Sequence, residues 1–144
     1  MRVEITLPER FIFSTRLRVR ASDVNYGGHL GNDSVLTLLQ ESRVLFFQSL
    51  GFKDEANIEG DVGQIIADFI VQYKAESFMG DILDIHLAIE NVHRYGFEMV
   101  YQIVRDDEKE IARAKSNNLC FDYTKRKIAS VPAPFLEKIN QLQN

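Results

Sequence analysis

Apolar and polar positions along the first third of the chain predict one strand followed by a long helix. Between Arg10 and Arg20, apolar side chains occupy alternate positions and serine or arginine most of the others, a pattern typical of a half-buried strand. The run from Val35 to Leu50 is apolar around much of its circumference. It follows residues 32–34, all potential N-terminal caps, and precedes Gly51, where a C-terminal cap belongs. We therefore expect a helix of about four turns that is covered by other parts of the protein.

The rest of the chain alternates with a period of two. Four stretches do so, separated by glycine or polar turns, and they comprise residues 65–73, 83–89, 97–105 and 111–123. We expect these four strands to form an antiparallel meander. Pro132 and Pro134 then end the extended structure, and the spacing from Phe135 to Leu142 predicts a short amphipathic helix. The order predicts an α+β fold in which one helix covers a face of a curved antiparallel sheet of about five strands.

Length, charge and cysteine content narrow the class of protein. The 144 residues, 45% of them hydrophobic, suffice for one well-buried core, so we expect a single domain over residues 1–144. The net charge of -4 and the lack of a long basic stripe argue against nucleic acid as a partner. No stretch of about 18 uncharged apolar residues is present to enter a membrane, and the N-terminus lacks a secretory signal pattern. The single cysteine, Cys120, lies in an apolar run and predicts a buried thiol in a cytoplasmic protein.

The segment between the first strand and the helix predicts a site that polarises a carbonyl group. Residues 21–33 combine Asp, Asn, Ser and three glycines, a composition that cannot continue a strand. Gly27 to Leu30 lead into the helix near Asn32, so backbone N–H groups and the positive end of the helix dipole can converge on one oxygen. The glycines let the backbone approach a substrate closely.

The segment from Arg18 to Phe47 resembles the 4-hydroxybenzoyl-CoA thioesterase family and its plant acyl-carrier-protein thioesterase relatives. The family signature runs Asp-x-Asp, a short Gly-containing stretch, His-Val-Asn-Asn, and then a helix with Glu followed by Arg. Two positions depart from it: Asn25 replaces the second Asp, which is often the catalytic carboxylate, and Gly31 replaces the first asparagine. The ending from Phe121 to Pro132 also looks like the family's last strand, basic turn and terminal proline. The residues at matching positions are Asp23, Gly28, His29, Leu30, Asn32, Glu41 and Arg43.

The resemblance implies the hotdog fold, a long central helix wrapped by a curved antiparallel sheet, and hydrolysis of a small or medium acyl-CoA. It also implies active sites between subunits, and open sheet edges need cover, so we expect a homodimer or homotetramer. We expect coenzyme A to be part of the substrate, and we expect no separate cofactor. No metal is expected, since His86 and His93 have no further ligands at metal-binding spacing. Lys125 and Arg126, in a basic turn, are candidates to contact the CoA phosphates, although short charge runs are more often simply solvated.

Thioester hydrolysis needs a polarised carbonyl and either an activated water or a carboxylate nucleophile. The amide of Asn25 can orient water or bind the thioester oxygen, but it cannot accept a proton at neutral pH. The resemblance leaves two carboxylates, because some branches of the family use a loop Asp and others a helix Glu. We favour Glu41 over Asp23 as the general base, and His29 is a further catalytic candidate. Gly28, Leu30 and Asn32 are candidate substrate contacts, and the side chains that can line an acyl pocket are Phe46, Phe47, Phe69 and Phe78.

Each candidate also has a structural interpretation. Asp23 can bond the backbone of its own loop, His29 can donate to a carbonyl, and Asn32 is more often a helix cap than a ligand contact. Glu41 and Arg43 can belong to a polar network of the helix. Two other functions also fit the sequence: a hotdog hydratase or dehydratase, and a non-catalytic acyl-CoA-binding protein. The missing second Asp favours the binding protein, whereas the hydratases resemble a different Asp-to-His spacing.

Overall fold

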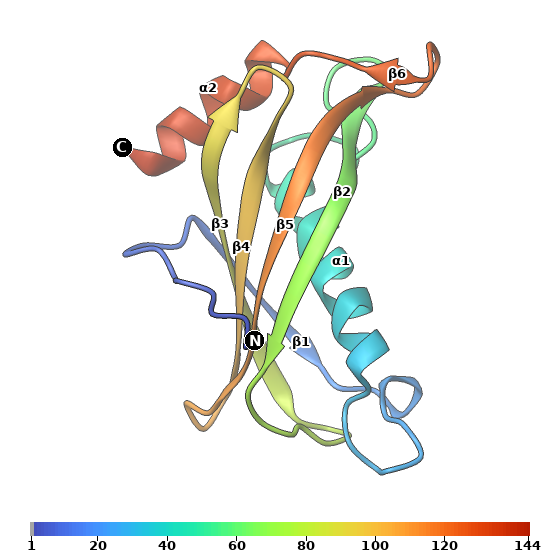
Figure 1. Ribbon diagram of the computed structural model, residues 1–144, viewed down its shortest axis with the longest axis vertical. Coiled ribbons are helices and arrows are strands. Elements are labelled where there is room, and N and C mark those ends of the chain that lie inside the picture. The colour runs from blue at the N-terminus through green and yellow to red at the C-terminus, as the bar shows by residue number, and fades with distance from the viewer. Residues whose placement is uncertain (1) are drawn as a thin grey trace.

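The computed structural model describes residues 2–144, and its strands form one antiparallel sheet. The order across the sheet is β1-β3-β4-β5-β2, with β6 beside β5. Figure 1 shows the sheet strongly twisted and curved. The sequence predicted about five strands. The sixth, β6, was not predicted because it is too short to produce a periodic pattern. The strands are β1 (Phe13–Arg18), β2 (Val62–Tyr73), β3 (Ile82–His93), β4 (Gly96–Arg105), β5 (Glu110–Asp122) and β6 (Lys127–Ile128).

The expected meander of the last four long strands is wrong. β3, β4 and β5 are successive neighbours, but β2 pairs with β5, from Val62 opposite Asp122 to Tyr73 opposite Ala112. β1 pairs with β3 and takes the place that a meander gives to β2. Alternation along a strand reports which face is buried and carries no information about which strand lies beside it. β1 and β2 are therefore the two ends of the sheet order, and within residues 2–144 no other strand pairs with the second edge of β2.

Two helices, α1 (Asn32–Ser49) and α2 (Ala133–Gln143), and a short 3-10 turn, η1 (Ala21–Asp23), complete the fold. α1 lies behind the sheet in Figure 1, and the segment before β1, in dark blue, loops out on the left of the sheet. The predicted end of α1 is confirmed. Gly51 has a φ of 92°, its N–H donates to Gln48 O (2.9 Å), and the N–H of Phe52 donates to Phe47 O (3.1 Å). These are the two bonds of a Schellman cap, which needs a residue that tolerates positive φ.

The core lies between α1 and the sheet. Alternate residues of β3 and β4 face it, among them Leu83, Ile85, Leu87, Phe97, Met99 and Ile103, each at most 1% exposed. Phe46 and Phe47 of α1 are completely buried here, and Phe47 stacks on Phe135 of α2 with ring centroids 5.5 Å apart. The expectation that Phe46 and Phe47 line an acyl pocket is therefore wrong. Cys120 is buried as predicted, and its burial raises the pKa of the thiol to about 12.

A β-bulge divides β2 into two halves. The register against β5 shifts between Ile66 and Asp68, so one extra residue enters the strand. Before the bulge Gln64 is buried and Ile65 is 39% exposed; after it Phe69 is partly buried and Ile70 is 43% exposed. The uninterrupted alternation predicted for residues 65–73 placed Ile65 and Phe69 on one face, which is wrong because the bulge changes the phase.

A buried hydrogen-bond network joins the middle of α1 to the sheet. Arg43, 4% exposed, donates from Nε to Glu55 Oε2 (2.8 Å) and from Nη1 to the Tyr101 hydroxyl (3.4 Å). Gln64 donates to the same Glu55 oxygen (2.6 Å), and Asn118 donates to Gln64 Oε1 (2.7 Å). Because each of these side chains has a partner, the network fixes α1 on the sheet without leaving a buried charge unpaired.

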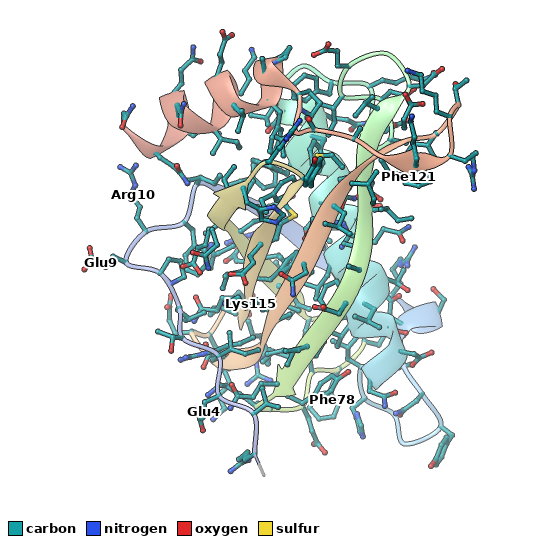
Figure 2. The ribbon with its side chains drawn as sticks, turned by 45° about the horizontal axis from the view of Figure 1, so that its top comes forward. Glu4, Glu9, Arg10, Phe78, Lys115 and Phe121 are labelled. Carbon is teal, nitrogen blue, oxygen red and sulfur yellow. The ribbon has the colours of Figure 1, made fainter. Side chains whose placement is uncertain are left out.

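The segment before β1 covers part of the outer face of the sheet. Ile5 is buried there, and its carbonyl accepts a bond from Arg113 Nη1 (3.0 Å). Arg10 donates from Nη2 to Leu142 O in α2 (3.1 Å), and Figure 2 shows Glu4, Glu9 and Arg10 along this segment. Between residues 2 and 144, neither helix is long and apolar enough to cross a bilayer.

Candidate functional site

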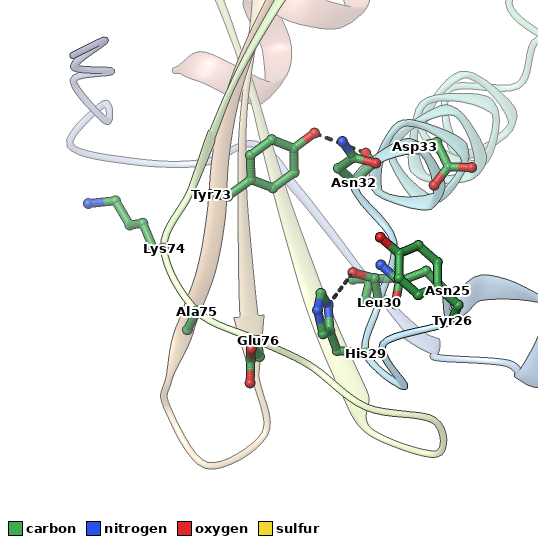
Figure 3. A pocket seen from close by; sticks show the side chains of 10 residues that line it. All are labelled: Asn25, Tyr26, His29, Leu30, Asn32, Asp33, Tyr73, Lys74, Ala75 and Glu76. Carbon is green, nitrogen blue, oxygen red and sulfur yellow. Dashed lines mark hydrogen bonds between the residues drawn. The ribbon is translucent and has the colours of Figure 1, made fainter. Parts of the chain in front are cut away.

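A pocket of about 670 Å³ opens where the loop after β1 meets the start of α1 and the end of β2. Figure 3 shows the loop and helix residues on one side and the strand residues on the other. The Tyr73 hydroxyl donates to Asn32 O (2.9 Å) and so ties the two sides together. The lining residues are Asn25, Tyr26, His29, Leu30, Asn32, Asp33, Tyr73, Lys74, Ala75 and Glu76.

A tight turn over residues 25–28 shapes the loop side. The N–H of Gly28 donates to Asn25 O (3.0 Å), and the N–H of Asn25 donates to His29 O (2.9 Å). Asn25 Oδ1 accepts a bond from the N–H of Gly27 (2.9 Å). Gly28 has a φ of 83°, a conformation that side chains disfavour. The glycine-rich sequence thus forms a loop, as predicted, and local hydrogen bonds hold its shape.

His29 presents one ring nitrogen that its own contacts leave available. Its Nδ1 lies 3.2 Å from Leu30 O, and because a carbonyl oxygen only accepts, Nδ1 carries a proton. In the tautomer with this proton on Nδ1, Nε2 is an acceptor. A Cβ on Gly27 would lie 3.4 Å from His29 Nε2 and 3.2 Å from Asn25 Oδ1, so both groups flank the same glycine. The expected bond from His29 to a carbonyl is present, and it leaves the other nitrogen free for a substrate or water.

The N-terminus of α1 opens on the pocket without a side-chain cap. Its N-cap is Gly31, which has no side chain, and no side-chain hydrogen bond caps the first turn. The prediction that residues 32–34 provide the cap is therefore wrong: Asn32 is the first helical residue, and it lines the pocket. The N–H groups of the first turn have no partner within the helix, and the positive end of the helix dipole lies among them. This arrangement suits an oxygen that carries partial negative charge.

Asp23 is close in sequence to the pocket but does not line it. The carboxylate is 3% exposed and accepts three bonds from Arg20, two to Oδ2 from the backbone N–H (2.8 Å) and Nε (3.1 Å), and one to Oδ1 from Nη2 (3.0 Å). Hydrogen bonding from Arg20 holds the pKa of Asp23 below its ordinary value. The carboxylate is thus committed to closing the 3-10 turn η1.

Glu41 lies in a different pocket. It is exposed on α1, and it lines a hollow of about 300 Å³ together with Leu17, Arg18, Arg20, Thr37 and Leu38. No residue is common to the linings of the two pockets. The two carboxylates favoured from the sequence therefore lie outside the pocket that contains Asn25 and His29.

Lys125 and Arg126 lie at the opposite end of β2 from the pocket. They follow Asp122, which pairs with Val62 at the start of β2, whereas the pocket includes Tyr73 at its end. Within one subunit, the structure brings together Asn25, His29, Leu30 and Asn32, with Gly28 in the turn between them. It does not bring Glu41, Lys125 or Arg126 to them, and the carboxylate of Asp23 turns away from them toward Arg20.

The sequence did not identify six of the residues that line the pocket, among them the polar residues Asp33, Tyr73 and Glu76. The sequence pattern identifies Asp33 only as a potential helix cap and Tyr73 only as the end of a strand. Position 33 carried a usable signal, since a carboxylate next to the matching Asn32 lies within the same motif. In the part of the chain from residue 2 onward, no three His, Cys, Asp or Glu side chains gather as a metal site would require.

Comparisons with known proteins point to one family. The model of the thioesterase-like superfamily matches residues 19–139. An Aquifex aeolicus protein named "Putative esterase" is 26% identical over 125 residues, covering 87% of this chain and 95% of its own. A 1,4-dihydroxy-2-naphthoyl-CoA thioesterase from Synechocystis superposes with a TM-score of 0.81 at 23% identity, over 92% of this chain and 98% of its own. A Staphylococcus aureus protein solved in complex with CoA superposes with a TM-score of 0.82 at 12% identity, over 96% and 87%. The structural likeness establishes the shared fold, the hotdog fold expected from the sequence.

Proposed function

This chain belongs to the thioesterase-like superfamily, and from the pocket at the start of α1 we propose that it hydrolyses the thioester bond of a small or medium acyl-CoA. One observation carries the proposal: the uncapped N-terminus of α1, the amide of Asn25 and the ring of His29 converge on one pocket. Family membership makes the reaction class a hydrolysis, and the pocket supplies polar groups suited to it.

The backbone at the start of α1 is suited to stabilise the oxyanion. When water adds to a thioester, the carbonyl oxygen gains negative charge, and fixed N–H donors lower the energy of that state most strongly when water is excluded. The first-turn N–H groups of α1 are such donors, and the helix dipole adds to their effect. The CoA thiolate is a good leaving group, so oxyanion stabilisation and delivery of water are the main requirements on the protein.

Asn25 and His29 are suited to hold the attacking water. His29 Nε2 is an acceptor in the neutral ring, and Asn25 Oδ1 already accepts one bond from the loop backbone. The amide nitrogen of Asn25 remains a donor for water or for the thioester oxygen. Gly28, Leu30 and Asn32 shape the surface against which the thioester lies.

The size of the pocket and two structural relatives support an acyl-CoA substrate. A volume of about 670 Å³ accommodates a substrate of this class. The Synechocystis relative is a thioesterase for an aromatic acyl-CoA, and the Staphylococcus aureus relative binds CoA. The hydratase or dehydratase and the non-catalytic binding protein gain no support from these comparisons.

The proposal includes a homodimer formed through the free edge of β2. Ile65, Ile70 and Tyr73 are between 39% and 48% exposed on this strand, and an open edge carries unpaired backbone groups. A twofold axis that pairs two β2 strands antiparallel sets the Tyr73 end of one against the Val62 end of the other. Lys125 and Arg126 of the partner subunit then approach the pocket, where they are suited to contact CoA phosphates. In this dimer the joined sheets wrap α1 as the central helix, each chain forming one domain.

Release of free thiol from a panel of short, medium, long and aromatic acyl-CoA esters tests the proposal. We expect turnover of at least one short, medium or aromatic ester by the wild-type protein. An enoyl-CoA added to the panel detects hydration in parallel. Saturable acyl-CoA binding with no thiol release from any ester would contradict the proposal and favour the binding protein.

A further inference from the structure

The pocket contains a carboxylate that the family signature does not assign. Among the described residues that line it, two are acidic, Asp33 and Glu76. Glu76 follows β2 on the strand side, and in Figure 3 its side chain points away from Asn25 and Asn32. Asp33 is the second residue of α1, beside the first-turn N–H groups that are suited to hold the oxyanion.

The side chain of Asp33 folds back over the helix start toward Asn25. A Cβ on Gly31 would lie 2.6 Å from Asp33 Oδ1, a separation that real Cβ atoms do not reach, and 3.7 Å from the Cβ of Asn25. The carboxylate of Asp33 therefore occupies the space that a side chain at position 31 would need, next to Asn25. On the other side of the pocket, burial and then the negative charge of Asp33 raise the pKa of Tyr73, so the carboxylate acts electrostatically on the opposite wall.

Two departures from the family signature follow from this one placement. Gly31 stands where the signature has asparagine, and any side chain there would displace the carboxylate of Asp33 from this position. Asn25 stands where the signature has aspartate, and an aspartate there would add a second negative charge close to the first. Both substitutions are consistent with a site carboxylate at position 33 in place of the one that the signature has at position 25.

We infer that Asp33 is the general base of the active site and replaces the aspartate that Asn25 lacks. The inference rests on the proposed thioesterase function and names the residue that activates water for it. Asp33 takes a proton from water while the water oxygen bonds to the thioester carbon, and the carbonyl electron pair moves onto oxygen. The tetrahedral intermediate then reforms the C=O bond and expels the CoA thiolate, which takes the proton from Asp33. The free acid and CoA thiol leave, and the carboxylate is regenerated.

An aspartate in the first turn of a helix also stabilises the helix dipole, so the test must separate catalysis from stability. Thiol release is measured for the wild type, Asp33→Asn, Asn25→Asp/Asp33→Asn and Glu76→Gln, with Glu137→Gln as a control that removes an exposed carboxylate from α2. For Asp33→Asn we expect kcat to fall by about 10² to 10⁴-fold, with KM changed by less than about threefold. Thermal unfolding of every variant shows whether it is folded.

Rescue distinguishes a catalytic from a structural role. In Asn25→Asp/Asp33→Asn a carboxylate returns at the position of the family signature, and we expect kcat to recover by at least about tenfold over Asp33→Asn. If Asp33 only stabilises the helix dipole, a carboxylate at position 25 does not restore turnover. Suppose that the wild type turns over its substrate. The inference is then overturned if Asp33→Asn is as active as Glu137→Gln, or if Glu76→Gln loses more activity than Asp33→Asn. Either result leaves the thioesterase function standing. Absence of turnover in the wild type would overturn both.

Discussion

The two halves of α1 use polar residues in opposite ways. In the middle of the helix, Arg43 is buried and bonded to Glu55 and Tyr101, and the network continues through Gln64 to Asn118. At the start of the helix, the first-turn N–H groups have no side-chain cap, and Asp33 lines a pocket. A fully bonded network stabilises the fold, whereas polar groups left open toward a cavity are available to a ligand.

The comparison separates two functions within one sequence motif. Arg43 and His29 both match the thioesterase signature, yet Arg43 contacts only the protein and His29 lines the pocket. A signature therefore records positions that the fold needs together with positions that the reaction needs. Substitutions in the bonded half should change the free energy of unfolding, and those in the open half should change turnover.

The largest loss of stability is expected for Phe47→Ala, in the bonded half of α1. Phe47 is completely buried and contacts the rings of Phe46 and Phe135. Removing such a ring leaves a cavity and lowers the free energy of unfolding by about 3–5 kcal/mol. Urea denaturation measures the loss, with Phe47→Leu as a control of smaller effect. Turnover per folded molecule at low temperature should stay near the wild-type value, and a loss larger than the unfolded fraction would break the comparison.

A somewhat smaller loss is expected for Arg43→Met. The substitution leaves Glu55 without its charged partner, and removing one member of a buried pair destabilises by about 3 kcal/mol, near the low end of the usual range because Glu55 is 22% exposed. Combining it with Glu55→Gln removes the unpaired charge, so the double variant should recover part of the stability. Equal stability of the single and double variants in urea denaturation would show that Arg43 acts by packing alone.

Much of this fold could be predicted from local patterns. Both helices and the five long strands were located because each periodicity lies within one stretch of sequence, and Gly51 marked the end of α1 correctly. The pairing of β2 with β5 was not predictable in this way, because it depends on β1 occupying the place beside β3. The bulge at residue 67 was also invisible, since an inserted residue leaves the composition of the strand unchanged.

The candidate site was predictable to the extent that it lies in one loop. Asn25, His29, Leu30 and Asn32 are close in sequence and come together in the pocket. Which carboxylate lies in the pocket was not predictable, because it depends on the direction in which each side chain points. Asp23 turns toward Arg20, and Glu41 lies on the side of α1 that faces β1. The placement of Asp33 depends on the missing side chain of Gly31, a contact that only the folded backbone reveals.

In the loop that lines the pocket before α1, His29→Gln should reduce turnover while leaving stability almost unchanged. Glutamine is uncharged and close in size, but its amide oxygen is a far weaker proton acceptor than the ring Nε2 that we assign to the attacking water. We expect kcat to fall by about 10²-fold, and the free energy of unfolding to change by less than about 0.5 kcal/mol. Thiol release and urea denaturation are measured on the same preparations. A loss of stability that accounts for the loss of turnover would assign His29 to the bonded, structural residues.

The smallest effect is expected for Asp23→Asn, which tests a residue of the loop that the structure places among the bonded groups. Bonding to Arg20 holds the pKa of Asp23 below its value in the unfolded chain, about 3.9. A lowered pKa in the folded state stabilises the protein above the unfolded value, and the stabilisation is lost as the pH falls through the folded pKa. Asp23→Asn should therefore cost about 1–2 kcal/mol at pH 7, and less as the pH falls below about 4.

Unfolding of the wild type and Asp23→Asn in urea, at several pH values between neutrality and the acid limit of folding, measures this difference. A difference independent of pH would mean that the contribution of Asp23 comes from shape and neutral hydrogen bonding instead of charge. Turnover by Asp23→Asn should stay within about tenfold of the wild type, because the carboxylate faces Arg20 and not the pocket. A drop in turnover as large as that expected for His29→Gln would show that Asp23 is a catalytic residue. The division of the loop into bonded structural groups and open catalytic groups would then be wrong.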